Sequence, residues 1–271
     1  MSTFPIHHLE AKLERCRVRI RINEVPAVEM SAAGEQPEWF APPINLYLVG
    51  RGNRIDVDVW PLEREDGSYE TFEAVEFHGA VRVYGKGDAV APGEGPLLVD
   101  LPVMTELVQR REAAAERDEE LPIPQRFSLA FDNEGPDFSA ELLDAPALPD
   151  DDALRDYAVL LRDRMRAGDV RALVDEMGPK VRAYAQAYDE AAVTLEKSLL
   201  SVLRDDYAPR GFMTDFERDD VVIVPNAART LCELQRPEGL PLIQTPPDAE
   251  GGTLQIAVVA GVREGALRVV R

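Results

Sequence analysis

The chain has 271 residues, of which 45% are hydrophobic and 30% charged, and its formal net charge is −20 at pH 7. This composition is globular rather than disordered, and the length suits one large domain or two of ordinary size. A strongly negative surface repels phosphate backbones and anionic lipid, so the charge argues against nucleic-acid binding and membrane-surface roles.

The negative charge is concentrated in the N-terminal half. Residues 1–149 hold 14 Lys and Arg against 28 Asp and Glu, whereas residues 150–271 hold 16 against 22. Such a field raises the rate at which a basic protein partner associates, although solubility alone would also explain it. We expect a basic protein partner, no nucleic acid and no membrane.

A cytoplasmic location is expected because the N-terminus has no long apolar signal region and no apolar run reaches the length of a membrane span. A sequence from which a signal peptide had already been cleaved would show the same N-terminus. The two cysteines, Cys16 and Cys232, both lie in apolar or alternating runs, so two buried free thiols are favoured over one disulfide.

The N-terminal half shows mostly the period-2 pattern of strands. Residues 9–15 are compatible with a helical turn, and residues 16–22 alternate arginine with apolar side chains. Residues 45–49 and 54–60 are predicted to form a hairpin around the Gly- and Asn-containing turn 50–53. Further strands are expected at 72–77, 79–84, 96–101, 126–131 and 138–142, with a helix at 103–120. The fold class predicted for residues 1–147 is an all-β antiparallel sandwich with an inserted helix.

The C-terminal half begins with helical periodicity and ends with strands. Asp150 is placed to cap a helix, a short helix follows from 170 to 177, and one long helix is predicted over 180–206. Strands are then expected at 221–224, 229–236, 240–244, 253–262 and 266–271. The prediction for residues 148–271 is an α+β domain in which helices precede a curved antiparallel sheet.

Two resemblances add to this prediction. The run 43–59, with its Gly50-Arg-Gly-Asn53 turn, is similar to a strand-turn-strand of galactose-binding-like β-sandwich domains. The helix containing Tyr157, the Gly168-Asp169 break and the closing strands 255–271 resemble the nuclear-transport-factor-like or SnoaL-like α+β cone group. The second resemblance implies a conical pocket, but no histidine lies in 150–271, whereas catalytic members often use a pocket His or Asp.

No complete catalytic, metal or nucleotide signature is present, so we expect no catalytic residue, no metal site and no cofactor. His7 and His8 are predicted to be a surface or frayed-terminus pair, and His78 a loop histidine. Asp56 and Asp58 could be a carboxylate pair. A cross-strand ion lattice with the arginines of 16–22 is the favoured interpretation.

Two sets of residues remain candidates for function. Tyr184, Tyr188, Asp189, Arg229 and Glu233 could project into a C-terminal pocket, although the favoured interpretation of the tyrosines is that they are core residues.

The second set, Trp39, Phe40, Asp56 and Asp58, is a candidate partner surface, in which the aromatic pair serves either as an anchor or as a plug of the sandwich. We expect a non-enzymatic, acidic interaction protein: an inhibitor, an immunity-type protein or an accessory subunit. The alternatives are a small-ligand binder or enzyme that uses the C-terminal pocket, and a structural homo-oligomer.

Overall fold

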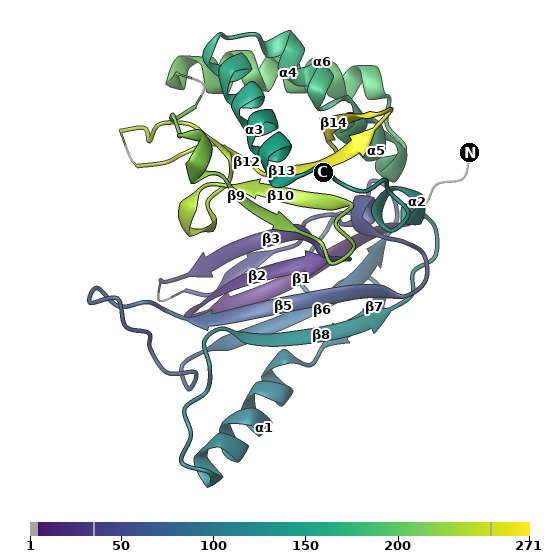
Figure 1. The fold of residues 1–271 in the computed structure, drawn as a ribbon. Coiled ribbons are helices and arrows are strands. Elements are labelled where there is room, and N and C mark those ends of the chain that lie inside the picture. The colour runs from purple at the N-terminus through teal and green to yellow at the C-terminus, as the bar shows by residue number, and fades with distance from the viewer. Residues whose placement is uncertain (1–4, 35, 212, 250) are drawn as a thin grey trace. The chain divides into compact units, whose positions relative to one another are not determined.

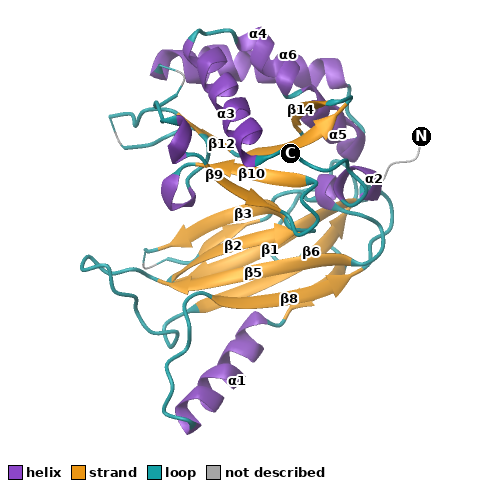
Figure 2. Cartoon of the chain, in the orientation of Figure 1, coloured by secondary structure: helices purple, strands orange, loops and turns teal. Residues whose placement is uncertain are grey.

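The structure, a computed structural model, describes residues 5–34, 36–211, 213–249 and 251–271. It combines antiparallel sheets with, among these residues, six α-helices, and all but α1 lie in the C-terminal half (Figures 1 and 2). None of the described helices has both the length and the apolar character needed to cross a bilayer. The chain divides into two compact units, Met1–Phe138 (unit 1) and Ser139–Arg271 (unit 2). The domain boundaries expected from the sequence stay a prediction.

Unit 1 contains two antiparallel sheets, in the strand orders β4-β1-β6-β7 and β3-β2-β5-β8. Its elements are β1 (Ile6–Glu14), β2 (Cys16–Ile22), β3 (Val25–Ala32), β4 (Glu38–Phe40), β5 (Asn53–Pro61), β6 (Glu76–Tyr84), β7 (Leu97–Leu101), α1 (Val103–Glu116) and β8 (Gln125–Phe131). Ile20 and Val57 from one sheet share a hydrophobic core with Leu13 and Phe77 from the other. Each sheet therefore buries one face, as the alternation of β2 and β5 predicts.

The helical turn expected at residues 9–15 is wrong, because these residues belong mainly to β1. This strand pairs with β6 along its whole length, from Ile6 opposite Tyr84 to Glu14 opposite Glu76. Leu9, Ala11 and Leu13 alternate into the core. Tertiary pairing therefore overrides the weak local preference for helix.

The hairpin predicted over 45–60 is also wrong in its first half. Residues Asn45–Tyr47 form a 3-10 turn instead of a strand. The buried Asn53 side chain accepts hydrogen bonds from the Val49 amide at 2.8 Å and from Asn23 Nδ2 at 3.0 Å. These bonds fix the loop before β5, so Asn53 closes a loop rather than a two-residue hairpin turn. The strand expected at 72–77 begins only at Glu76.

The ion lattice predicted across β2 and β5 is confirmed only for Arg21 and Asp58, and the other charges have partners on other strands or on their own strand. Asp58, buried at 4% exposure, is 2.9 Å from Arg21 and 3.2 Å from Arg126 on β8. Asp56 pairs with Arg54 at 2.7 Å. The remaining arginines of β2, Arg17 and Arg19, both pair with Glu29 on β3. These carboxylates are therefore occupied by structural ion pairs.

Unit 2 places helices before strands, as predicted. Its sheets have the orders β14-β13-β10-β9 and β11-β12. Its elements are α2 (Ser139–Leu142), α3 (Asp151–Arg166), α4 (Val170–Glu176), α5 (Gly178–Tyr188), α6 (Ala192–Val202), β9 (Val222–Pro225), β10 (Leu231–Gln235), β11 (Ile243–Gln244), β12 (Gln255–Ile256), β13 (Val258–Arg263) and β14 (Ala266–Val269). Asp150 caps α3 by accepting from the Ala153 amide at 2.9 Å, as expected. The strand expected at 138–142 is wrong, since α2 occupies most of it.

The long helix predicted over 180–206 is broken into α5 and α6. Asp189 ends α5 in the left-handed conformation, with φ of 51°, which an aspartate tolerates better than most residues. After α6 the chain passes into a π-helical turn, Leu203–Tyr207. The break changes the direction of the chain, so that the apolar faces of α5 and α6 enclose space instead of forming one continuous stripe.

Candidate functional site

An apolar groove lies in unit 2 between α5, α6 and β12. Its cavity volume of about 410 Å³ falls in the range of small-ligand pockets. The lining comes from the two helices, the π-helical turn and the residues around β12: Met177, Lys180, Val181, Tyr184, Leu195, Leu199, Val202, Tyr207, Gln255, Ile256 and Ala257. Most of these side chains are apolar, so the groove suits a hydrophobic ligand.

Helix α6 is unusual because it is rich in apolar residues and yet buries none of them. Leu195 and Leu199 face the groove and are only half-buried, and Val202 is 42% exposed. A helix of this composition normally packs its apolar face against a core. The groove is thus an apolar space that the protein's own side chains leave unfilled.

Lys180 places a positive charge in this apolar lining. No hydrogen bond or ion pair of its side chain occurs within the part of the chain that the structure describes. Glu176, four residues earlier, is instead bound by Arg164, Arg268 and the Tyr157 hydroxyl. Burial, and after it the positive charge of Arg271, lowers the pKa of the Lys180 ammonium to about 8. Lys180 is therefore mostly charged at pH 7, without a carboxylate to balance it.

The structure brings only one of the five predicted pocket residues to the groove, namely Tyr184. Its ring contacts that of Tyr188 at 4.4 Å between centroids, and Tyr188 itself is buried. Asp189 forms the break after α5. Arg229 pairs with Asp151 at 2.6 Å, and Glu233 lies in β10, so neither belongs to the groove lining. Lys180 was missed by sequence reasoning, although it lies one helical turn before Tyr184.

The four residues of the predicted partner surface lie on different sheets. Trp39 and Phe40 belong to β4, where Trp39 is 38% exposed and Phe40 packs partly against the core. Asp56 and Asp58 lie on β5 of the other sheet, in the ion lattice. The aromatic pair thus has one exposed ring and one partly buried ring, and the carboxylates are already paired.

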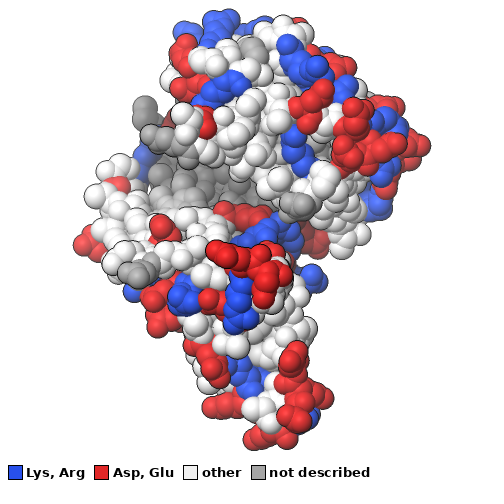
Figure 3. All heavy atoms as spheres, turned by 90° about the vertical axis from the view of Figure 1, so that its left-hand side faces the viewer, with Lys and Arg blue, Asp and Glu red and all other residues white. Residues whose placement is uncertain are grey.

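A different acidic surface is found at the end of α1. Residues 112–120, whose charged side chains are exposed, contribute five carboxylates and one arginine, and α1 extends away from both sheets of unit 1 (Figure 1). We call this segment the acidic arm. In Figure 3 its red carboxylates gather at the bottom of the view. The last turn of α1 has no basic residue, so Glu112 and Glu116 oppose the negative end of the helix dipole.

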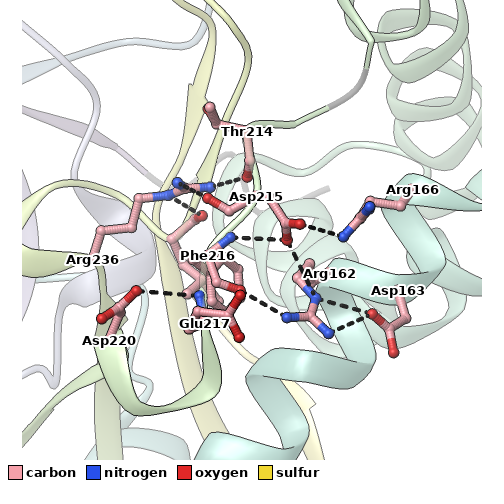
Figure 4. Close-up of polar contacts among 10 residues, drawn as sticks. Arg162, Asp163, Arg166, Thr214, Asp215, Phe216, Glu217, Asp220 and Arg236 are labelled. Atoms are coloured by element: carbon pink, nitrogen blue, oxygen red, sulfur yellow. Dashed lines mark hydrogen bonds and ion pairs between the residues drawn. The ribbon is translucent and has the colours of Figure 1, made fainter.

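Three arginines also converge on residues 214–217 in unit 2 (Figure 4). Asp215 pairs with Arg166 and lies 3.8 Å from Arg162. Arg162 Nη1 donates to the Phe216 carbonyl at 2.7 Å, and Arg236 donates to the carbonyls of Thr214, Asp215 and Leu242. Because these donors are already used by backbone and carboxylate oxygens, the cluster anchors this segment and is no anion site.

The histidines and cysteines offer no reactive group. The surface placement predicted for His7 and His8 is wrong: both are buried in β1, where His7 Nδ1 lies 3.0 Å from Asn45 Oδ1. Burial lowers the pKa of His7. Cys16 and Cys232 are buried free thiols, as predicted, and burial raises the pKa of each to about 12. His78 is exposed on β6. Within the described ranges, no cluster of His, Cys, Asp and Glu could hold a metal ion.

Comparison with known proteins gives no relative: no protein-family model, curated protein or solved structure matches this chain. The resemblances to the galactose-binding-like and nuclear-transport-factor-like groups therefore stay predictions.

Proposed function

We propose that unit 2 is a small-ligand binding domain whose apolar groove between α5 and α6 is the binding site. The observation that carries this proposal is the incompletely buried apolar face of α6, with Leu195 and Leu199 lining an open cavity of about 410 Å³. An apolar ligand in the groove would bury these side chains and gain free energy in proportion to the apolar area removed from water. Most of the described residues that line the groove are apolar, so we propose ligand binding as the function of the groove.

Fluorescence of the neutral probe N-phenyl-1-naphthylamine tests this function. We expect the protein to enhance the emission of the probe, and Leu199→Trp to weaken binding at least about tenfold because the larger ring fills the groove. Val193→Trp is the matched control: Val193 is on the same helix, 63% exposed and outside the groove. Equal binding by all three proteins, or no binding by any, would contradict the proposal.

A second candidate function is binding of a basic protein partner through the acidic arm, as an inhibitor, immunity-type or accessory protein. The supporting observation is local: carboxylates accumulate where the dipole of α1 disfavours them, and among the described residues Arg117 to Glu119, at 2.7 Å, is the one ion pair within the arm. The repulsion between these charges would be relieved by a basic surface.

Neutralising the arm tests this second function. The variant replaces Glu112, Glu116, Asp118, Glu119 and Glu120 by their amides, and the control does the same at five exposed glutamates of unit 1, Glu63, Glu65, Glu76, Glu94 and Glu134. In pull-downs from lysate at low and moderate salt, we compare the amount of basic partner that each protein recovers. The arm variant is expected to recover at least about tenfold less than wild type and the control. If the arm variant and the control variant recover the same amount of partner, binding depends on total net charge and not on the arm, and the second function is contradicted.

We further propose that unit 1 is an antiparallel β-sandwich domain and unit 2 an α+β domain with a curved sheet. The shared core of the two sheets of unit 1 supports the first assignment, and the helix-then-strand order of unit 2 supports the second. The homo-oligomer named as an alternative stays a prediction. A mass that rises with concentration in light scattering would support it.

A further inference from the structure

We propose that the ligand of the groove is an amphipathic carboxylate, a molecule with an apolar chain and one acidic head, and that Lys180 binds the head. This inference rests on the small-ligand function proposed above and adds the chemical class of the ligand. The geometry that supports it is a single ammonium group within an otherwise mainly apolar lining.

The residues that line the groove include an apolar set and one positively charged residue. Leu195, Leu199 and Val202 of α6 face Val181 of α5, and together they offer an apolar channel for a chain. Lys180 lies on the first turn of α5, where its ammonium has no carboxylate partner among the described residues. An apolar chain with a terminal carboxylate would satisfy both parts at once.

The other charges near Lys180 favour an anion over a neutral head. Arg271, buried at 3% exposure, acts on Lys180 as a like charge. Its guanidinium pairs with Glu141 at 3.0 Å. The carboxylate of Glu176 is bound by Arg164, Arg268 and Tyr157, so it is unavailable to neutralise Lys180. Charge-assisted hydrogen bonds are about twice as strong as neutral ones, so a carboxylate gains more here than a hydroxyl.

The size of the groove limits the occupant. A volume of about 410 Å³ lies near the lower end of small-molecule pockets. A protein helix has a diameter of about 10 Å including side chains, so a cavity of this volume would hold only about one turn of it. A single-chain acid is therefore the occupant to which we commit.

The test compares decanoic acid with 1-decanol, which share a chain length and differ in the head group. Binding is measured by displacement of N-phenyl-1-naphthylamine and by calorimetry at pH 7. Wild type is expected to bind the acid at least about tenfold more tightly than the alcohol. Lys180→Met should reduce this preference to less than about twofold while alcohol binding is retained, and Lys180→Arg should keep most of it.

Lys197→Met is the matched control, because Lys197 is exposed on α6 outside the groove. Its acid preference should equal that of wild type. If the alcohol binds as tightly as the acid in wild type, or if Lys180→Met keeps the preference, the ligand class is wrong while the groove remains a binding site. If neither decanoic acid nor 1-decanol nor the neutral probe binds, the proposed function itself fails.

Discussion

Replacing Glu176 with alanine is expected to lower the free energy of unfolding by about 3–5 kcal/mol, the cost of breaking a buried ion pair from one side. The carboxylate has 6% of its side chain exposed. It accepts from the Tyr157 hydroxyl at 2.9 Å and from Arg268 at 3.0 Å, and it also pairs with Arg164. Burial, with the nearby Glu176 charge, raises the pKa of Tyr157. Alanine would remove the carboxylate acceptor of the Tyr157 hydroxyl and of two guanidinium groups, which would keep only backbone carbonyl acceptors.

Urea unfolding followed by helical circular dichroism measures this loss in unit 2, which holds every described α-helix except α1. Tryptophan fluorescence reports unit 1, since both tryptophans, Trp39 and Trp60, lie there. Asp175→Ala is the control on the same helix, because that carboxylate is 59% exposed, and it should cost less than about 1 kcal/mol. A similar small loss for Glu176→Ala would show that the network contributes little.

Lys180→Met is expected to stabilise the free protein at pH 7 by about 1–3 kcal/mol, because it removes the cost of a charged ammonium in the groove lining, which partial exposure reduces. The pKa of Lys180 is lowered from 10.5 to about 8 by burial and by Arg271. Between these values the unfolded chain binds more protons than the folded chain, so the stability of wild type rises with pH across this window. The methionine variant lacks this contribution.

The difference in unfolding free energy between Lys180→Met and wild type should therefore shrink from pH 7 to about pH 10. Urea titrations at both pH values measure it, and the comparison cancels effects of other groups that titrate alike in both proteins. Burial raises the pKa of Tyr207 to about 12 and also raises that of Tyr184, so both groove tyrosines ionise less readily than free tyrosine. A difference that is constant with pH would mean that Lys180 is not desolvated.

Sequence periodicity correctly predicted the elements in which buried and exposed residues alternate regularly within the element itself. Strand β2 matches the alternating run 16–22, and α3 follows the capping aspartate Asp150. The wrong predictions lie where contacts between residues far apart in the sequence determine the local structure. Residues 9–15 join a strand because β6 pairs with them. Residues 45–49 do not form the expected strand, and the Asn53 side chain accepts a hydrogen bond from the Val49 amide there. Neither partner can be recognised from the local pattern.

The candidate site was only partly predictable from the sequence. The long helix predicted over 180–206 contains Val181, Tyr184, Leu195, Leu199 and Val202, and all five line the groove. The break at Asp189 was not predicted, because one left-handed residue leaves no periodic signal. Without the break, these residues would form a continuous stripe with Lys180 at its edge. The position of Lys180 in the groove lining therefore follows from the three-dimensional structure and not from the sequence pattern.

The most direct test of the groove is nuclear Overhauser spectroscopy of the methyl-labelled chain with decanoic acid. We expect contacts from the ligand chain to methyl groups of Val181, Leu195 and Leu199, with no contact to the exposed Val193 of α6. Contacts confined to other parts of the chain, or none at a ligand concentration that displaces the neutral probe, would contradict it.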